Sequence, residues 1–185
     1  MTAEGKPVTE FSRPIQVTSL EAGDNRFRIA PDSDERAALA RRFDLNELVR
    51  FSAEFVLKPV AGNVQVHVEG RIEAEVEQPC VVTLEPVHDS INHRFHCTFS
   101  TEAGTEEEAE LDVGWDEDDP DEPIIDGIID IGEVAAERLG LEINPFPRAP
   151  DAEFNGYTSS EGAEPAESVT AKPFAALKNM LDRKN

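Results

Sequence analysis

An uninterrupted alternation of apolar and polar residues from Val64 to Val76 constrains the fold more than any other feature of the chain. Every even position is apolar or glycine, and every odd position is polar. Strand side chains point alternately to opposite faces, so this period of two predicts a long strand with one face buried and one face in water. The inward positions are Val64, Val66, Val68, Gly70, Ile72, Ala74 and Val76.

A second alternating run, from Val49 to Leu57, precedes this strand. Between the two runs lies Ala61-Gly62-Asn63, a combination that favours a tight turn. We therefore expect a β-hairpin at the centre of a sheet. In its first strand the core-facing residues are Val49, Phe51, Ala53, Phe55 and Leu57, and the polar face carries Arg50, Ser52, Glu54 and Lys58.

Shorter patterns extend the sheet on both sides of the hairpin. Residues 14–20 and 26–29 are candidates for short strands before it. The alternation of Cys80, Val82 and Leu84 predicts another strand after it, and residues 91–99 predict one more with its odd positions inward. Together these strands form an antiparallel meander.

Two segments have the pattern of helix starts. Asp32 with Glu35, and Asp130 with Glu133, have the spacing of a capping box, in which each side chain satisfies a backbone N–H at the helix start. Strands and helices do not alternate regularly, which indicates an α+β fold with two or three helices packed on the antiparallel sheet. The second helix ends before Pro145 and Pro147, and its inner stripe is Ile131, Val134, Ala135 and Leu139.

The 185 residues suit one domain with tails. We predict a flexible arm over 1–11, an α+β domain over 12–150 with an acidic loop at 102–123, and a linker over 151–171. Residues 172–185 predict a short amphipathic helix with an apolar stripe of Phe174, Leu177, Met180 and Leu181. This helix could dock on a partner or fold back onto its own domain, and both readings stay open.

Charge is the strongest signal in the composition. The chain has 39 acidic and 17 basic residues, and residues 95–185 alone hold 23 acidic and 6 basic residues. No Lys or Arg lies between Arg94 and Arg138. Such a segment would repel nucleic acid, so direct RNA binding is expected to be weak, and it would attract basic proteins. The alternative is a solvated loop that keeps the protein soluble.

The sequence shows no clear catalytic or metal site. His93 and Cys97 share a face of the predicted strand but lie about 13 Å apart, and His96 points the other way. The sequence has no phosphate-binding loop, no nucleophile elbow and no Cys placed beside a His with an orienting partner. We therefore expect neither enzymatic activity, a hydrolase included, nor a cofactor or a metal. With two cysteines, no apolar run of ~20 residues and no signal peptide, a soluble, reducing, cytoplasmic setting is expected.

Several short motifs carry a family resemblance. They are Gly70-Arg71-Ile72-Glu73-Ala74-Glu75-Val76 leading into Cys80, then Leu84-Glu85-Pro86, Ile129-Asp130-Ile131-Gly132-Glu133, Glu137-Arg138-Leu139 and Pro145-x-Pro147. With them the chain resembles the YceD family of bacterial ribosome-biogenesis proteins over about residues 13–147. The motif residues singled out are Gly70, Cys80, Leu84, Asp130, Glu133, Glu137 and Pro145.

The resemblance implies a non-enzymatic role in accumulation of the large-subunit (23S) ribosomal RNA. Many members have a further cysteine where this chain has Thr83, and some have further cysteines where it has the residues 148–151, so no zinc role is carried over. We expect a basic ribosomal protein or an assembly factor as the partner, with an adaptor unrelated to ribosomes as the alternative. The expected binding residues are Glu106, Glu107, Glu108, Asp116, Glu117, Asp118 and Asp119.

Overall fold

A computed structural model describes residues 9–60, 64–101 and 120–153 of the chain. The chain divides into a compact unit of Met1–Ala152 and a second unit of Glu153–Asn185. The amphipathic helix predicted over 172–185 and nearly all of the predicted linker lie outside the described residues, so these boundaries stay predictions. The same holds for residues 1–8 of the predicted arm, whereas Phe11 at its end is fully buried in the core.

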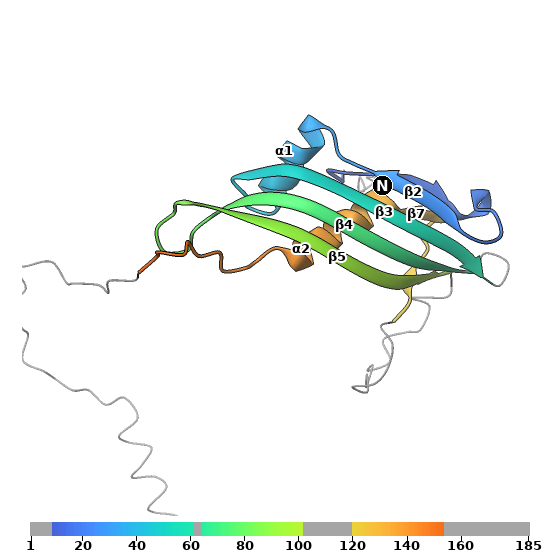
Figure 1. Ribbon diagram of the computed structural model, residues 1–185. Coiled ribbons are helices and arrows are strands. Elements are labelled where there is room, and N and C mark those ends of the chain that lie inside the picture. Colours follow the sequence, from blue (N-terminus) through green and yellow to red (C-terminus); the bar gives the residue numbers. More distant parts are fainter. Residues whose placement is uncertain (1–8, 61–63, 102–119, 154–185) are drawn as a thin grey trace, which may run out of the picture. The chain divides into compact units, whose positions relative to one another are not determined.

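A five-stranded sheet with the order β2-β3-β4-β5-β6 forms the centre of the first unit (Figure 1). Strands β2 to β5 pair antiparallel with their neighbours in chain order, which confirms the predicted meander and the α+β class. Strand β6 instead runs parallel to β5, through Phe99↔Glu122 and Ser100↔Pro123, at the end of the segment predicted as loop. The strands are β2 Asn25–Ile29, β3 Glu47–Val60, β4 Gln65–Pro79, β5 Pro86–Ser100 and β6 Glu122–Pro123.

Both predicted helix starts are present. Asp32 caps α1 (Ser33–Arg42) in a reciprocal capping box with Glu35, as the spacing predicts. Asp130 caps α2 (Ile131–Glu142) through the N–H groups of Gly132 and Glu133. The predicted return bond from Glu133 is wrong, because its carboxylate reaches Arg42 at 2.8 Å instead. An ion pair with Arg42 thus replaces the hydrogen bond that the Glu133 side chain would make in a capping box.

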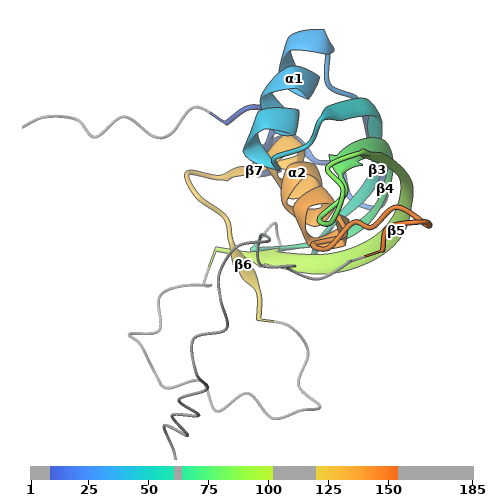
Figure 2. The same ribbon diagram turned by 90° about the vertical axis from the view of Figure 1, so that its left-hand side faces the viewer.

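Helix α2 lies on the concave side of the curved sheet, and α1 lies next to β3, on the side of the sheet away from β5 (Figure 2). The predicted inner stripe of α2 is confirmed: Ile131, Val134, Ala135 and Leu139 are buried in the core. A small second sheet pairs β1 (Pro14–Gln16) with β7 (Ile128–Asp130), and a short 3-10 helix, η1 (Val17–Ser19), takes the place of the rest of the strand expected over 14–20. Neither described helix is long and apolar enough to cross a membrane.

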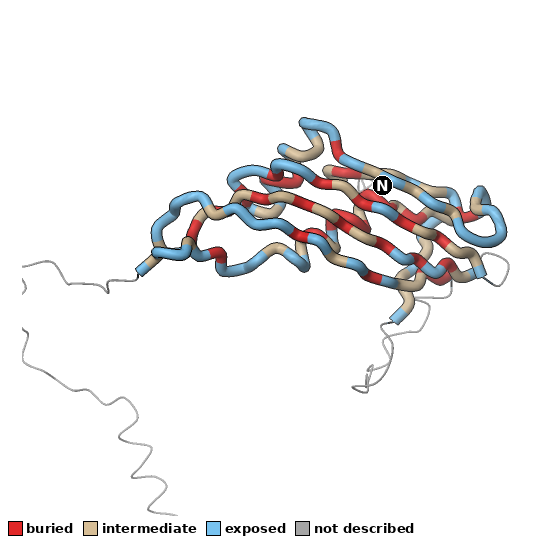
Figure 3. The backbone as a smooth tube through the Cα atoms, viewed as in Figure 1, coloured by how far each residue is buried: buried red, intermediate tan, exposed pale blue. Residues whose placement is uncertain are grey.

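The alternation along β4 is confirmed residue by residue, as the buried and exposed bands of Figure 3 show. The prediction that Val64 faces inward is wrong, because this residue precedes β4 and is exposed. Even positions from Val66 onward are buried, and the pattern continues past the predicted end through Gln78 to Cys80. Gly70 is buried opposite Phe95, whose ring would lie 2.2 Å from a Cβ added there. A glycine in the middle of this strand therefore makes room for an aromatic ring of its neighbour.

The prediction that Val49 faces the core is wrong. A β-bulge between Leu48 and Arg50 adds one residue to β3, so Leu48 is buried and Val49 is 43% exposed. Beyond the bulge the predicted register holds, and Phe51, Ala53, Phe55 and Leu57 are all buried. A bulge moves the side chains on one side of it to the opposite face of the strand. Alternation alone does not locate this bulge, because Leu48 and Val49, either of which could face inward, are both apolar.

The strand predicted over Cys80, Val82 and Leu84 is also wrong. These residues form the turn between β4 and β5, and Leu84 has a positive φ of 62°. The N–H of Leu84 donates to the carbonyl of Cys80 at 2.9 Å, a bond within the turn that an extended strand would not form. In β5 the odd positions face inward as predicted, with His96 exposed on the other face.

Candidate functional site

The carboxylates expected to bind a partner lie outside the described residues, because all of them fall within 102–119. The structure does describe both ends of that segment. The N–H of Ile124 donates to the carbonyl of Ser100 at 2.9 Å, beside the parallel β5–β6 pairing. The acidic segment therefore leaves and re-enters the fold at one place, the end of the sheet edge. The seven residues are Glu106, Glu107, Glu108, Asp116, Glu117, Asp118 and Asp119.

Apart from Gly70, which lies in the middle of β4, the motif residues fall into two groups in space. Asp130, Glu133 and Glu137 lie on the first turns of α2, where Asp130 also accepts the N–H of Arg13 at 2.6 Å. Cys80 and Leu84 lie in the β4–β5 turn, and the exposed Pro145 follows α2. The second group is drawn together by the bond from the N–H of Val81 to the carbonyl of Pro147, 2.9 Å long.

Backbone N–H groups from two distant parts of the chain surround the Cys80 sulfur. The Sγ atom accepts hydrogen bonds from Val82 and Thr83 at 3.4 Å and from Ala149 at 3.3 Å. The side chain is fully buried. Thr83 and the stretch 148–151 are the positions where the family resemblance implies further cysteines, so the structure gathers those positions around one sulfur.

These donors stabilise the thiolate. The N–H of Ala149 is the largest cause, followed by Thr83, and together they outweigh burial and lower the pKa of Cys80 from 9.0 to about 6. At Cys97 the balance is reversed, because burial raises the pKa of that thiol to about 11. The pKa values of the two cysteines of the chain are thus shifted in opposite directions.

This difference predicts a pH dependence of stability. Since the folded-state pKa of Cys80 lies below its unfolded value, the unfolded chain binds more protons between about pH 6 and pH 9, and stability rises with pH in that window. The contribution is lost as the pH falls through about 6. Urea unfolding at pH 6, 7 and 8 should therefore show the stability gap between wild type and Cys80→Ser widening with pH. Cys97→Ser, the matched control, should follow wild type, and a constant gap for Cys80→Ser would contradict the charged sulfur.

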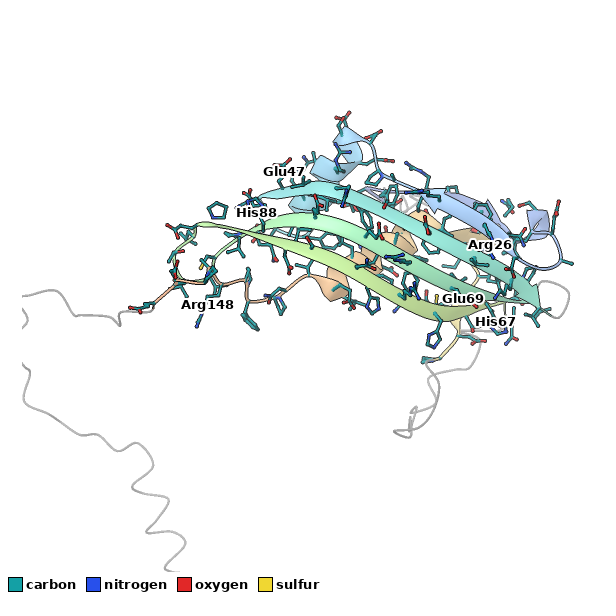
Figure 4. All side chains as sticks on the ribbon, in the orientation of Figure 1. Arg26, Glu47, His67, Glu69, His88 and Arg148 are labelled. Atoms are coloured by element: carbon teal, nitrogen blue, oxygen red, sulfur yellow. The ribbon has the colours of Figure 1, made fainter. Side chains whose placement is uncertain are left out.

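A cleft of about 420 Å³ lies beside the turn, between the start of β5 and the segment after α2. Figure 4 shows His88 and Arg148 at this end of the sheet. Gln78 lines the cleft and donates to the carbonyl of Asn144 at 2.9 Å. In the described part of the chain no hydrogen bond joins Cys80 to a histidine, the residue type that most often activates a cysteine nucleophile.

The predicted metal candidates are not brought together. His93 and Cys97 share the inner face of β5 as expected, but His93 lies 3.3 Å from Glu142 of α2. Within residues 9–60, 64–101 and 120–153 no group of three His, Cys, Asp or Glu side chains could hold a metal ion. Thr83 and Ala149 carry no thiol, so the positions where the family resemblance implies further cysteines supply hydrogen-bond donors to Cys80 instead.

The contact between Cys80 and Ala149 was not foreseeable from either segment alone. The two residues are 69 positions apart, and neither lies in a helix or strand. The one local signal is the sequence of a lone cysteine followed three residues later by a threonine and then Leu-Glu-Pro, a combination for which composition gives no reason.

Fold and site together define a class: an α+β domain whose long antiparallel sheet curves over one helix, with a cysteine-centred turn joining two of its strands. The family model described as large ribosomal RNA subunit accumulation protein YceD matches residues 68–181, and the chain belongs to this family. The family name implies a role in accumulation of the large-subunit ribosomal RNA, and the family is not known as one of enzymes. No curated protein and no solved structure matches the chain.

Proposed function

We propose that this protein supports accumulation of the large-subunit (23S) ribosomal RNA without catalysing a reaction, by binding a basic ribosomal protein or assembly factor through its acidic segment. The observation that carries the proposal is charge. Residues 102–119 contain ten Asp or Glu and no Lys or Arg. Unbound ribosomal proteins are strongly basic because they neutralise RNA phosphates, so a carboxylate cluster is the complementary surface.

The described ends of the segment support this role. Ser100 and Ile124 are joined by a backbone hydrogen bond, and Arg138 holds Glu122 at 3.0 Å. Both ends of the acidic segment are thus fixed at this edge of the domain, and the ten carboxylates between them would add to the local field felt by a basic partner. Holding such a partner until RNA competes for it would place the protein in the cytoplasm, where ribosomes assemble.

A deletion strain tests the cellular role. We expect large-subunit RNA and particles to fall relative to small-subunit ones, because a basic protein that is not shielded is lost to aggregation or degradation before assembly. Sucrose-gradient profiles and the ratio of the two ribosomal RNAs measure this. Normal large-subunit levels in the deletion strain would overturn the ribosomal role and favour an adaptor unrelated to ribosomes.

A neutralised variant tests the acidic segment itself. Changing the seven carboxylates named above to Asn or Gln should leave the melting temperature unchanged and weaken binding to basic proteins, with the wild-type interaction fading as salt rises because exposed charges are screened beyond about 8 Å at physiological ionic strength. A control with Glu21→Gln, Asp34→Asn and Glu47→Gln removes three exposed charges elsewhere. Full rescue of the deletion strain by the neutralised variant would remove the segment from the mechanism.

A further inference from the structure

Leu84 combines three unfavourable features. Its φ is 62°, in the left-handed region that favours glycine or asparagine. Its side chain is apolar, and 78% of it is exposed. A glycine would relieve the backbone strain, and a polar residue would suit the exposure. Backbone strain that no contact within the fold explains is typical of residues that take part in an interaction.

The turn around Leu84 is held firmly. Besides the bonds to the Cys80 sulfur, the N–H of Cys80 donates to the carbonyl of Glu85 at 2.8 Å, and the N–H of Leu84 donates back to Cys80 at 2.9 Å. Thr83 adds a side-chain bond to Glu85. A side chain presented by a fixed turn loses little freedom on binding, which favours affinity.

Two more apolar side chains extend this surface. Val81 is 50% exposed and Phe146 is 75% exposed. The bond between Val81 and Pro147 places them on neighbouring segments, which run side by side at one end of the sheet in Figure 1. We call Val81, Leu84 and Phe146 the apolar tip. Exposed apolar side chains on neighbouring segments mark an interaction surface more often than isolated apolar residues do.

Charge identifies the kind of partner. The two stretches that form this end of the domain, residues 77–89 and 141–153, contain six Asp or Glu and a single Arg. This acidic rim disfavours RNA and anionic lipid. It also disfavours a second copy of a chain whose net charge is minus 22. An apolar centre with an acidic rim fits a protein whose apolar pocket is surrounded by Lys and Arg.

We propose that the apolar tip anchors the basic protein partner, with Leu84 inserted into an apolar pocket of that partner. The inference rests on the proposed function and adds to it a second contact, distinct from the acidic segment and insensitive to salt. Cys80 acts as a positioning residue, because its three N–H contacts fix the turn that presents Leu84.

The test uses the immobilised full chain and the proteins extracted with high salt from purified large ribosomal subunits. Leu84→Gly should melt at an unchanged or higher temperature, because it relieves the positive φ, yet bind the captured protein at least about tenfold more weakly. Leu84→Met keeps an apolar side chain and should bind like wild type. Asp126→Gly is the matched control, since Asp126 is exposed with a φ of 55° and lies in the β6–β7 turn.

The outcomes separate the two proposals. Capture by wild type and by Leu84→Gly with equal affinity would overturn the apolar anchor alone. Failure of wild type to capture any large-subunit protein would overturn the proposed function and the anchor with it. Sedimentation showing a wild-type dimer that Leu84→Gly converts to a monomer would replace the basic partner with a second copy of the chain.

Discussion

Val66→Asp is expected to destabilise the domain by on the order of 4 kcal/mol and to lower its melting temperature by about 10 °C. Val66 lies in β4 between Pro59 and Phe99 of the neighbouring strands, and its side chain is fully buried. A carboxylate there would lose its hydration and gain no partner, and protonation would leave an unsatisfied polar group in its place. Thermal and urea unfolding followed by circular dichroism measure the loss.

The adjacent residue supplies the control. His67 points to the opposite face, is exposed and contacts Thr98 at 3.0 Å. His67→Asp places the same charge one residue away, in water and near Lys58, and should change stability by no more than about 0.5 kcal/mol. Equal losses in the two variants would mean that the faces of β4 are assigned incorrectly.

The parts of the fold that sequence alone predicted are those governed by local periodicity. The alternation along β4 survived intact because both of its faces meet a uniform environment, core on one side and water on the other. The capping box of Asp32 and Glu35 formed because its two bonds involve residues only three apart. Such patterns need no knowledge of the rest of the chain.

Long-range contacts explain where the predictions differed. The Glu133 carboxylate accepts a hydrogen bond from Arg42, 91 residues away in sequence, and does not make the predicted capping-box bond. Val49 turned outward because β3 must match β4 beyond a bulge, and Leu48 is an equally apolar substitute. Phe11 was assigned to an arm, yet it packs edge-on against Phe51 with ring centroids 5.9 Å apart. None of these partners lies in the local window that a pattern covers.

The candidate site shows the same limit. Alternation over Cys80, Val82 and Leu84 is a correct description of the sequence, but the sulfur of Cys80 draws the N–H groups of Val82 and Thr83 toward itself and closes a turn. The Cys80 sulfur and backbone carbonyl groups compete for the same N–H donors. Ala149, in the segment after α2, supplies the third N–H donor to the sulfur. A motif that looks like a short strand is therefore a turn that exposes a leucine.

Gly132→Ala is the second substitution expected to have a large effect, a loss of about 3 kcal/mol. A Cβ at this position of α2 would lie 2.6 Å from the carbonyl oxygen of Phe11 and 2.8 Å from the backbone nitrogen of Arg13. That backbone is not free to move, because Arg13 donates to Asp130 and accepts from Ile131. The methyl group would therefore push Phe11 out of the core, and urea unfolding should measure the cost.

Gly140→Ala in the same helix separates this close approach from helix propensity. There the nearest atom to an added Cβ is at 2.8 Å on the ring of Phe43, a partly exposed side chain that can rotate away. Alanine is favoured over glycine in a helix by about 1 kcal/mol, so Gly140→Ala should stay within about 1 kcal/mol of wild type. A loss at Gly132 no greater than that at Gly140 would show that the segment from Phe11 to Arg13 does not pack against the start of α2. The glycine in the Ile129-Asp130-Ile131-Gly132-Glu133 motif would then need another explanation, whereas the expected result makes it the point where the chain before β1 is fastened to the core.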